Sequence, residues 1–375
     1  MKFTLKDNCY LKRLEQPHIY DTVADELYLL DEESFNRVSA LCEGQDDPEA
    51  AELLDEAGLL QLEPRGNAIY VDGRSDDPSL RYLEVQITTR CDKVCRHCYL
   101  GNPRDSDMEP VDFSTILEEF SRMQGLKVMV SGGEPSCHPR FDEIIRILPG
   151  FPLRSVLITH GEWIGPKEAE LLGRYFHQVQ VSLDGLEPGH DALRGDGSFS
   201  VVVSGIRALR ETGVSVSVGT MVHRQNLNEF ETMSDMLKNL DVQEWDIDVP
   251  CPVGRWGSER TASKMLKIMS EKLRHAYGGS FHGGSAGLAC GSHLMTVGPG
   301  GEAAKCGFYM DSPAGKVSDG LGNSWRTIKH VLLSELQCQC EQLNECSGGC
   351  RFRAEVLEGS DLAPDIVQCY ARGVK

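Results

Sequence analysis

Short apolar runs alternate with stretches of helical period from residue 81 onward. Each run is bounded by polar or turn residues and is rich in β-branched side chains, which favours a strand. Six strands are predicted in this way: Tyr82 to Ile87, Val128 to Val130, Val156 to Thr159, Val179 to Leu183, Val214 to Val222 and Trp245 to Val249.

The segments between these runs carry apolar residues three or four positions apart, as in helices that cover a sheet. The predicted helices are Asp112 to Met123, Phe141 to Leu148, Pro166 to Phe176, Phe199 to Thr212, Leu227 to Leu240 and Ser258 to Tyr277. Strands that alternate with helices predict parallel, right-handed crossovers. We therefore expect an α/β fold, a partial (β/α)6 TIM-type barrel over residues 80–278, with its chemistry at the carboxyl ends of the strands.

Residues 1–75 lack this rhythm and predict a small α+β unit. We expect two short strands within His18 to Leu30, and helices at Glu33 to Cys42 and Pro48 to Ala57. Leu59 to Leu62 and Ala68 to Val71 predict a closing hairpin. The polar stretch Gly73 to Ser79, with its Gly and Pro, predicts a linker.

Residues 279–375 predict a third, loop-rich domain. Periodicity fades into Gly and Cys, and only Ser324 to Leu336 predicts a helix. A segment this poor in apolar residues buries little core, so bound metal is expected to stabilise it.

Composition narrows the partners and the compartment. The net charge of −19 disfavours nucleic acid and anionic membranes. No apolar run reaches the roughly 18 to 20 residues that span a bilayer, and the N-terminus lacks a secretory signal, which predicts a cytoplasmic protein. Fourteen cysteines in a reducing compartment indicate metal or redox chemistry rather than disulfides.

Cys91, Cys95 and Cys98 form a C-x3-C-x2-C triplet directly after the first barrel strand. Three thiolates can hold three irons of a [4Fe–4S] cluster and leave the fourth iron open to a ligand. Two other interpretations stay open. The triplet could be a zinc site with a fourth ligand such as His97, or three buried thiols.

The triplet resembles the signature of the radical S-adenosylmethionine (SAM) superfamily, and the resemblance extends to the second strand. Gly132, Gly133, Glu134 and Pro135 resemble its GGEP motif. In that superfamily the motif's backbone and Glu receive the amino group of SAM. Glycines allow close backbone approach, and a carboxylate suits an ammonium group.

Three further residues match the superfamily's SAM site. Ser182 and Arg194 stand where a Ser and an Arg hold the ribose and carboxylate of SAM. His97 replaces the usual aromatic residue before the third Cys, whose backbone lies near the adenine. As plain residues, Arg194 and His97 would be polar loop positions.

Seven cysteines in the last 86 residues resemble the SPASM extension of radical SAM enzymes. Its pattern implies two auxiliary [4Fe–4S] clusters, the first held by Cys290, Cys306 and Cys350 and the second by Cys338, Cys340, Cys346 and Cys369. The C-x-C spacing of Cys338 and Cys340 is one residue tighter than in the family.

The first auxiliary cluster then lacks one ligand. Cys251 could supply it, or the site could be open to substrate or water. A zinc knuckle of Cys338, Cys340, Cys346 and Cys350 is the alternative to both clusters. Cys9, Cys42 and Cys137 fit neither set and are expected to be buried apolar residues.

The resemblance implies an enzyme that cleaves SAM to a 5′-deoxyadenosyl radical, which abstracts hydrogen from a substrate C–H bond. An electron donor such as ferredoxin or flavodoxin would be required, and the clusters would make the enzyme oxygen-sensitive. No residue is singled out as the catalytic acid or base.

The N-terminal unit faintly resembles a PqqD-type peptide-recognition element, which binds a leader peptide as an added strand. It could instead be a cap that packs on the barrel. We expect a precursor peptide as substrate. Small-molecule cofactor or haem biosynthesis is the alternative, as is a passive metal-binding protein. Activation of a sulfatase is disfavoured, because Gly307 stands where those enzymes carry Asp.

Overall fold

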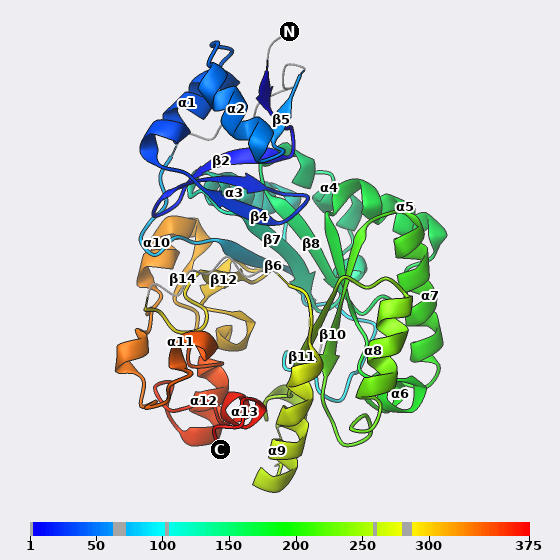
Figure 1. The fold of residues 1–375 in the computed structure, drawn as a ribbon. Coiled ribbons are helices and arrows are strands. Elements are labelled where there is room, and N and C mark those ends of the chain that lie inside the picture. The colour runs from blue at the N-terminus through cyan, green and yellow to red at the C-terminus, as the bar shows by residue number, and fades with distance from the viewer. Residues whose placement is uncertain (1–2, 63–72, 102–104, 258–260, 280–286) are drawn as a thin grey trace.

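The computed structural model describes residues 3–62, 73–101, 105–257, 261–279 and 287–375. Its centre is a nine-stranded sheet in the order β11-β10-β9-β8-β7-β6-β12-β13-β14. All six predicted strands are confirmed: β6 (Tyr82–Thr88), β7 (Lys127–Gly132), β8 (Arg154–Thr159), β9 (Gln178–Ser182), β10 (Ser215–Met221) and β11 (Glu244–Asp248). Neighbours among these six pair in parallel, which confirms the partial barrel (Figure 1).

Helices cover one face of this sheet and enclose the main hydrophobic core. They are α3 (Pro110–Arg122), α4 (Phe141–Ile145), α5 (Pro166–Tyr175), α7 (Ser198–Glu211), α8 (Phe230–Asn239) and α9 (Ser263–Ser270), close to prediction. The predicted helix Ser258 to Tyr277 is shorter, since a 3-10 turn, Glu271–His275, follows α9 and residues 258–260 lie outside the described chain. A short helix, α6 (Glu187–Arg194), was not predicted.

The opposite face of the sheet forms the barrel interior. Glu84 and Gln86 of β6 and Gln180 of β9 alternate with core residues, so they point to this inner face. The interior is therefore polar, whereas the helix-covered face is apolar.

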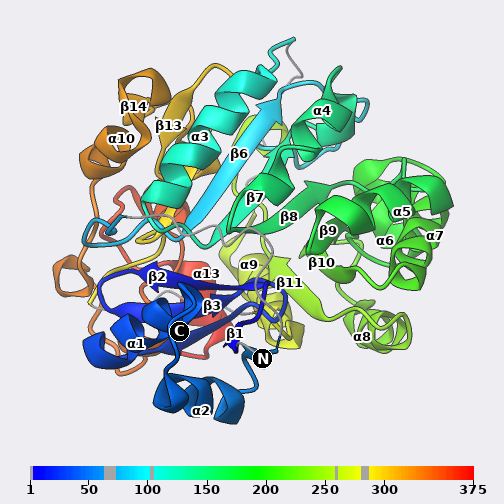
Figure 2. The same cartoon turned by 90° about the horizontal axis from the view of Figure 1, so that it is seen from above.

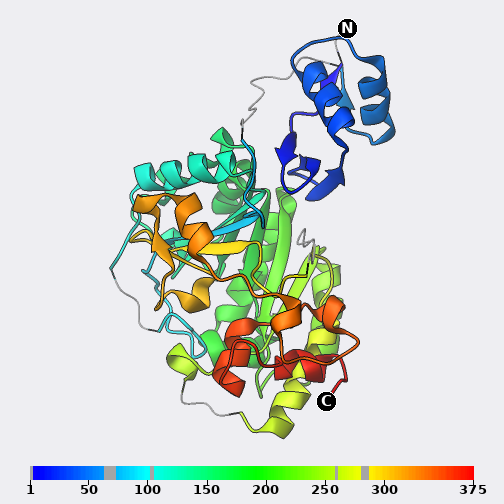
Figure 3. The same ribbon diagram turned by 90° about the vertical axis from the view of Figure 1, so that its left-hand side faces the viewer.

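The C-terminal segment extends the sheet and then faces the open side of the barrel (Figures 1 and 3). β12 (Leu294–Val297) pairs in parallel with β6, and β13 (Glu302–Ala304) and β14 (Gly315–Lys316) continue antiparallel. None of the three was predicted. After them come α10 (Leu321–Thr327), α11 (Leu343–Cys346), α12 (Arg351–Glu358) and α13 (Ile366–Ala371), and α13 packs against α9.

The predicted helix Ser324 to Leu336 is wrong in its second half. Ile328 is extended, and Leu332 bridges to Leu288 instead of continuing a helix. The Trp325 indole donates to the Pro78 carbonyl at 2.8 Å, which ties this short helix to the start of the barrel.

The N-terminal unit has its own core, in which Cys9 is fully buried and against which Cys42 packs. A three-stranded sheet, β2 (Cys9–Arg13), β3 (Pro17–Asp21) and β4 (Glu26–Leu29), precedes α1 (Glu32–Cys42) and α2 (Pro48–Glu56). β2 was not predicted. β5 (Leu60–Gln61) pairs with β1 (Thr4–Leu5), and the other half of the predicted hairpin lies outside the described residues.

This unit docks at the end of the barrel where the parallel strands begin (Figures 1 and 2). Lys12 donates to the carbonyls of Gly125 and Pro152 at 2.6 and 2.9 Å. Asp25, in the β3–β4 turn, pairs with Lys127 and Arg154, the first residues of β7 and β8. The N-terminal unit therefore lies opposite the end of the strands where chemistry is expected.

Candidate active site

The cysteine triplet lies in the loop after β6 and is held by the loop after β11. The Arg255 guanidinium donates to the Cys95 carbonyl and its backbone N–H donates to the Cys98 carbonyl, each at 3.0 Å. A Cβ on Gly254, which has φ +55°, would stand 2.4 Å from the Cys98 oxygen. Only glycine allows this approach, so the first and last strands of the parallel barrel meet at the triplet.

The three thiols share one environment. Burial raises the pKa of Cys91 to about 12, and the neighbouring Cys95 thiolate adds to the increase. Burial likewise raises the pKa of Cys95, and Cys98 contributes again. Cys91 and Cys95 are crowded thiols that resist ionisation, and a shared cationic group would stabilise them as thiolates. Together with Cys98 they fit an iron–sulfur cluster.

The Gly-Gly-Glu-Pro turn after β7 packs directly on the triplet's own loop. Added Cβ atoms on Gly132 and Gly133 would stand 2.4 and 2.2 Å from the carbonyl oxygens of Thr88 and Arg90. The Gly133 and Glu134 amides donate to those same oxygens at 2.8 and 2.7 Å. The glycines are thus required for close packing of two loops.

The Glu134 carboxylate is buried and fully engaged by the protein. One oxygen accepts from the hydroxyls of Thr159 and Ser136 at 2.7 and 3.0 Å. The other accepts from the His160 amide at 2.9 Å. In this conformation the Glu134 side chain binds the end of β8. The backbone of the turn, rather than this side chain, is therefore available to contact a ligand.

Arg194 returns to the triplet at the end of α6. Its guanidinium donates to the buried Asp184 carboxylate at 2.5 Å and lies 3.9 Å from the Cys95 sulfur and 3.3 Å from His97 Nε2. Burial would raise the pKa of Asp184, but Arg194 lowers it to about 2. Burial lowers the pKa of His97 to about 4, so this imidazole is neutral near pH 7.

Ser182 ends β9 in register with Gly219 of β10. It is half-buried, two residues before Asp184. The structure thus brings Ser182, Arg194 and His97 to the same end of the barrel as the triplet.

A chain of polar side chains that the sequence did not single out supports this end of the barrel. Lys93 of the triplet loop pairs with Glu162, which accepts from the Ser198 hydroxyl at 2.6 Å. Ser198 contacts His190 at 2.9 Å, and His190 Nδ1 accepts from the Asp184 amide at 3.0 Å. Only Asp184 carried a sequence signal, its place two residues after Ser182. The others come from separate loops and from the helices α6 and α7.

Three C-terminal cysteines gather with Cys251, after β11. Burial raises the pKa of Cys306 to about 12, with further increases from Cys350 and Cys290. Burial also raises the pKa of Cys251 to about 12, and Cys350 is the next contributor. Cys251 is 7% exposed, so it is a buried thiol whose pKa is affected by Cys350.

The other C-terminal cysteines line one pocket. Cys338, Cys340, Cys346 and Cys369 surround it, together with Leu343 and Arg372. The zinc-knuckle alternative would replace Cys369 with Cys350, which does not line this pocket. Within the described residues, no three His, Cys, Asp or Glu side chains converge as ligands of a single metal ion.

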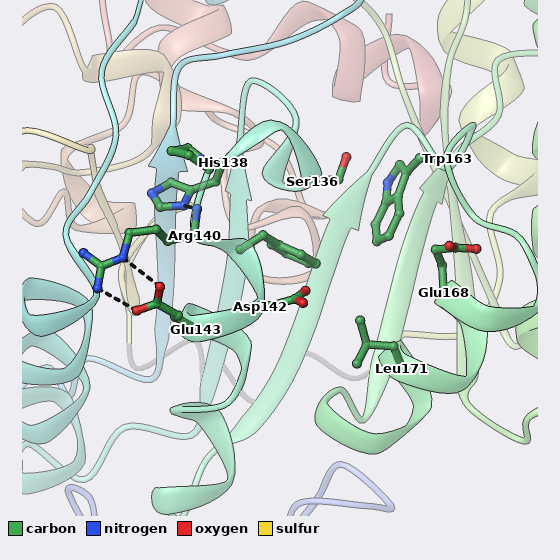
Figure 4. Close-up of a pocket in the computed structure, with 10 residues that line it drawn as sticks. Ser136, His138, Arg140, Asp142, Glu143, Trp163, Glu168 and Leu171 are labelled. Atoms are coloured by element: carbon green, nitrogen blue, oxygen red, sulfur yellow. Dashed lines mark hydrogen bonds and ion pairs between the residues drawn. The ribbon is translucent and has the colours of Figure 1, made fainter.

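A separate cavity of about 480 Å³ is lined by residues of α4, of α5 and of the segments that precede them (Figure 4). Trp163, Phe141, Arg140 and Glu143 line it, and Arg140 pairs with Glu143 at 2.6 Å. Ser136 lines this cavity and also donates a hydrogen bond to Glu134. None of the cysteines lines it, so the candidate active site is the strand end inside the barrel.

The described part of the chain contains no helix that is both long and apolar enough to cross a membrane.

Residues 85–237 match the model of the radical SAM superfamily. Over 345 residues, 78% of this chain and 88% of the relative, the sequence is 24% identical to the AdoMet-dependent heme synthase of Oleidesulfovibrio alaskensis. Over 337 residues, which are 77% of this chain and 83% of the relative, it is 29% identical to the mycofactocin maturase MftC of Mycobacterium tuberculosis.

Solved structures of Streptococcus suis SuiB match nearly the whole chain. Streptococcus suis SuiB bound to the precursor peptide SuiA superposes with a TM-score of 0.69 at 15% identity, over 97% of this chain and 99% of SuiB. The shared fold therefore includes the N-terminal unit and the cysteine-rich segment as well as the barrel.

Proposed function

Because residues 85–237 match the radical SAM superfamily, we propose that the chain is a SPASM-type oxidoreductase of that superfamily that modifies a ribosomally made precursor peptide. One observation carries the proposal. The thiol triplet, the glycine motif and Arg194 meet at the strand ends of a barrel whose open side faces a second set of cysteines.

Different residues of this chain would bind the cluster and the parts of SAM in the first site. Cys91, Cys95 and Cys98 would hold the [4Fe–4S] cluster that the superfamily uses together with SAM. The backbone of Gly132 to Pro135 would meet the amino group of SAM, and Arg194, already oriented by Asp184, would meet its carboxylate. Ser182 and His97 would contact the nucleoside.

When bound and given an electron, SAM and the cluster would supply a 5′-deoxyadenosyl radical for the removal of hydrogen from a C–H bond. Ferredoxin or flavodoxin is the proposed class of donor. The protein contributes orientation and the exclusion of water.

Two auxiliary [4Fe–4S] clusters are proposed in the C-terminal segment. Cys290, Cys306 and Cys350, with Cys251 as the fourth ligand, would hold one. The four cysteines that line the second pocket would hold the other. Two observations support this division. The cysteines of the second set line one pocket, and within each set the thiols raise one another's pKa.

The N-terminal unit supports a peptide substrate. β4 is an edge strand of the β2-β3-β4 sheet, and its Leu29 is 62% exposed. A leader peptide could add to such an edge through backbone hydrogen bonds. MftC is named a maturase, and SuiB was solved with a precursor peptide.

The second candidate is tetrapyrrole chemistry, since the curated relatives include AdoMet-dependent heme synthases of 24% identity.

Anaerobic reconstitution tests the proposal. We expect about 12 iron atoms per chain, four for each of three clusters, and reductive cleavage of SAM to 5′-deoxyadenosine. A Cys91, Cys95, Cys98 triple Ala variant should retain about eight irons and lose the cleavage. Zinc in place of iron, or cleavage that survives the triple substitution, would refute it.

The substrate class is tested separately. The reconstituted enzyme is incubated with SAM, reductant and the product of any short open reading frame beside its gene, and the peptide mass is followed. A mass change that requires SAM supports a peptide. Modification of a tetrapyrrole under the same conditions supports the second candidate instead.

A further inference from the structure

β11 presents three carboxylates to the barrel interior. Trp245 and Ile247 belong to the main hydrophobic core beneath the helices. Because side chains alternate along a strand, Glu244, Asp246 and Asp248 point the other way, into the barrel.

One of these three carboxylates is in an ion pair, and the other two are not. Asp248 pairs with the buried Arg353 of α12. Glu244 and Asp246 make no ion pair and no side-chain hydrogen bond among the described residues. Lys127 and Arg154, which also face the interior, are both engaged by Asp25.

Asp246 is reached by solvent but crowded by protein. Burial raises the pKa of Asp246, the Glu244 carboxylate raises it further, and the more distant Lys127, which is not in an ion pair with Asp246, lowers it. This is the environment of a side chain on the wall of an open barrel, where a partner of opposite charge would be favourable.

A second observation points to a ligand at the same place. Ser217 of β10 lies in register with Glu244, so both side chains point inward. Ser217 is 1% exposed, yet its hydroxyl has no hydrogen-bond partner in the structure. Buried hydroxyls are usually satisfied, and a bound group would satisfy this one.

Register also places these residues relative to the SAM contacts. Gly219 pairs with Ser182 on one side and with Asp246 on the other. Two strand spacings, about 10 Å between Cα atoms, separate Ser182 from Asp246. Gly219 has no side chain, and the Gln180 side chain covers it, with Nε2 2.9 Å from where a Cβ would stand. A group bound by Asp246 would therefore meet the Gln180 amide on the side toward Ser182.

We propose that Glu244, Asp246 and Ser217 form a substrate subsite that takes an ammonium or guanidinium group of the peptide to be modified. The inference rests on the proposed function and adds the class of residue recognised. Carboxylates bind such cations through charge-assisted hydrogen bonds, and a hydroxyl can accept another. Anionic side chains, including the carboxylates of a tetrapyrrole, would be repelled.

The test uses the reconstituted full chain with SAM bound and no reductant. Three probes are titrated by saturation-transfer NMR: Nα-acetyl-lysine methylamide, its norleucine counterpart and its glutamate counterpart. A partly exposed ion pair is worth up to about fivefold in affinity, so lysine should bind about fivefold more tightly than norleucine and glutamate least. Asp246→Asn, alone and with Glu244→Gln, should reduce the lysine preference to less than about twofold.

Asp235→Asn, on the exposed side of α8, removes the same charge outside the barrel and should keep the preference. Iron content and the spectral response to SAM are measured for each variant, to show that it is folded. Equal binding of the three probes to the wild type would overturn the inference. So would a lysine preference that survives the double substitution, or an Asp246→Asn variant that loses affinity for SAM instead. If the wild type forms no 5′-deoxyadenosine when reductant is added, the proposed function fails instead.

Discussion

Asp25 is predicted to hold the N-terminal unit on the barrel. Its carboxylate is 3% exposed, accepts from the Tyr20 hydroxyl at 2.6 Å, and pairs with Lys127 at 2.5 Å and Arg154 at 3.5 Å. Asp25→Asn removes the charge but keeps the shape. Asn also tolerates the positive φ of 58° found here. The substitution therefore isolates the electrostatic contribution.

Loss of one partner from a buried ion pair costs about 3 to 5 kcal/mol. The lower end applies, because the Lys127 side chain is 12% exposed and can be partly solvated. About 3 kcal/mol corresponds to roughly a hundredfold change in an opening equilibrium. Hydrogen exchange followed by mass spectrometry should therefore show amides of β2 to β4 exchanging roughly a hundredfold faster.

Asp46→Asn, an exposed loop residue of the same unit, serves as the control and should leave exchange unchanged. An increase of less than about threefold in Asp25→Asn would refute the reasoning, because the pair would then contribute well under 1 kcal/mol. A uniform increase through the barrel helices would refute it too, since the effect would not be local docking.

Three other variants test separate parts of the molecule. Gly133→Ala places a methyl group 2.2 Å from a backbone oxygen and should weaken SAM binding at least about tenfold. The spectral response to SAM measures this binding. Gly150 has open space around it, so Gly150→Ala should leave SAM binding unchanged. Cys251→Ser should leave one auxiliary cluster labile, with iron lost during desalting, whereas Cys42→Ala should keep full iron content. Burial would raise the pKa of Glu15, but the Ser79 amide and Arg81 lower it to about 2. The stability that Glu15 contributes is therefore complete above pH 4.5 and lost as pH falls toward 2, and thermal unfolding of wild type and Glu15→Gln should converge over that range.

The barrel was predictable because its pattern is long and periodic. Six strands and most helices follow from runs that repeat at strand or helical period. β12, β13 and β14 have two to four residues each, too short for such a pattern, and they form because β6 offers them an edge. α6 contains Pro188 and Gly189 in eight residues, a composition that reads as a loop.

The parts of the candidate site that depend on the spacing of residues along the sequence were predictable. The cysteine triplet and the glycine motif are local in sequence, and both lie where the parallel strands end. The pairing of Arg194 with Asp184 was also within reach, because α6 simply returns the chain ten residues later. The links from Glu134 to Thr159 and from Lys93 to Glu162 join different loops, so they depend on the folded barrel.

The two ends of β7 and β8 separate docking from chemistry. Asp25 contacts the first residues of these strands, whereas Gly132 and Thr159 end them and lead into the contacts of Glu134. Six residues of strand span about 20 Å, and the hydrogen bonds to the Glu134 carboxylate from Ser136, Thr159 and His160 all lie at the far end of the strands. Release of the N-terminal unit should therefore leave SAM cleavage intact and affect only the capture of a leader peptide. A loss of cleavage in Asp25→Asn at full iron content would mean instead that the docked unit holds the strands themselves in position.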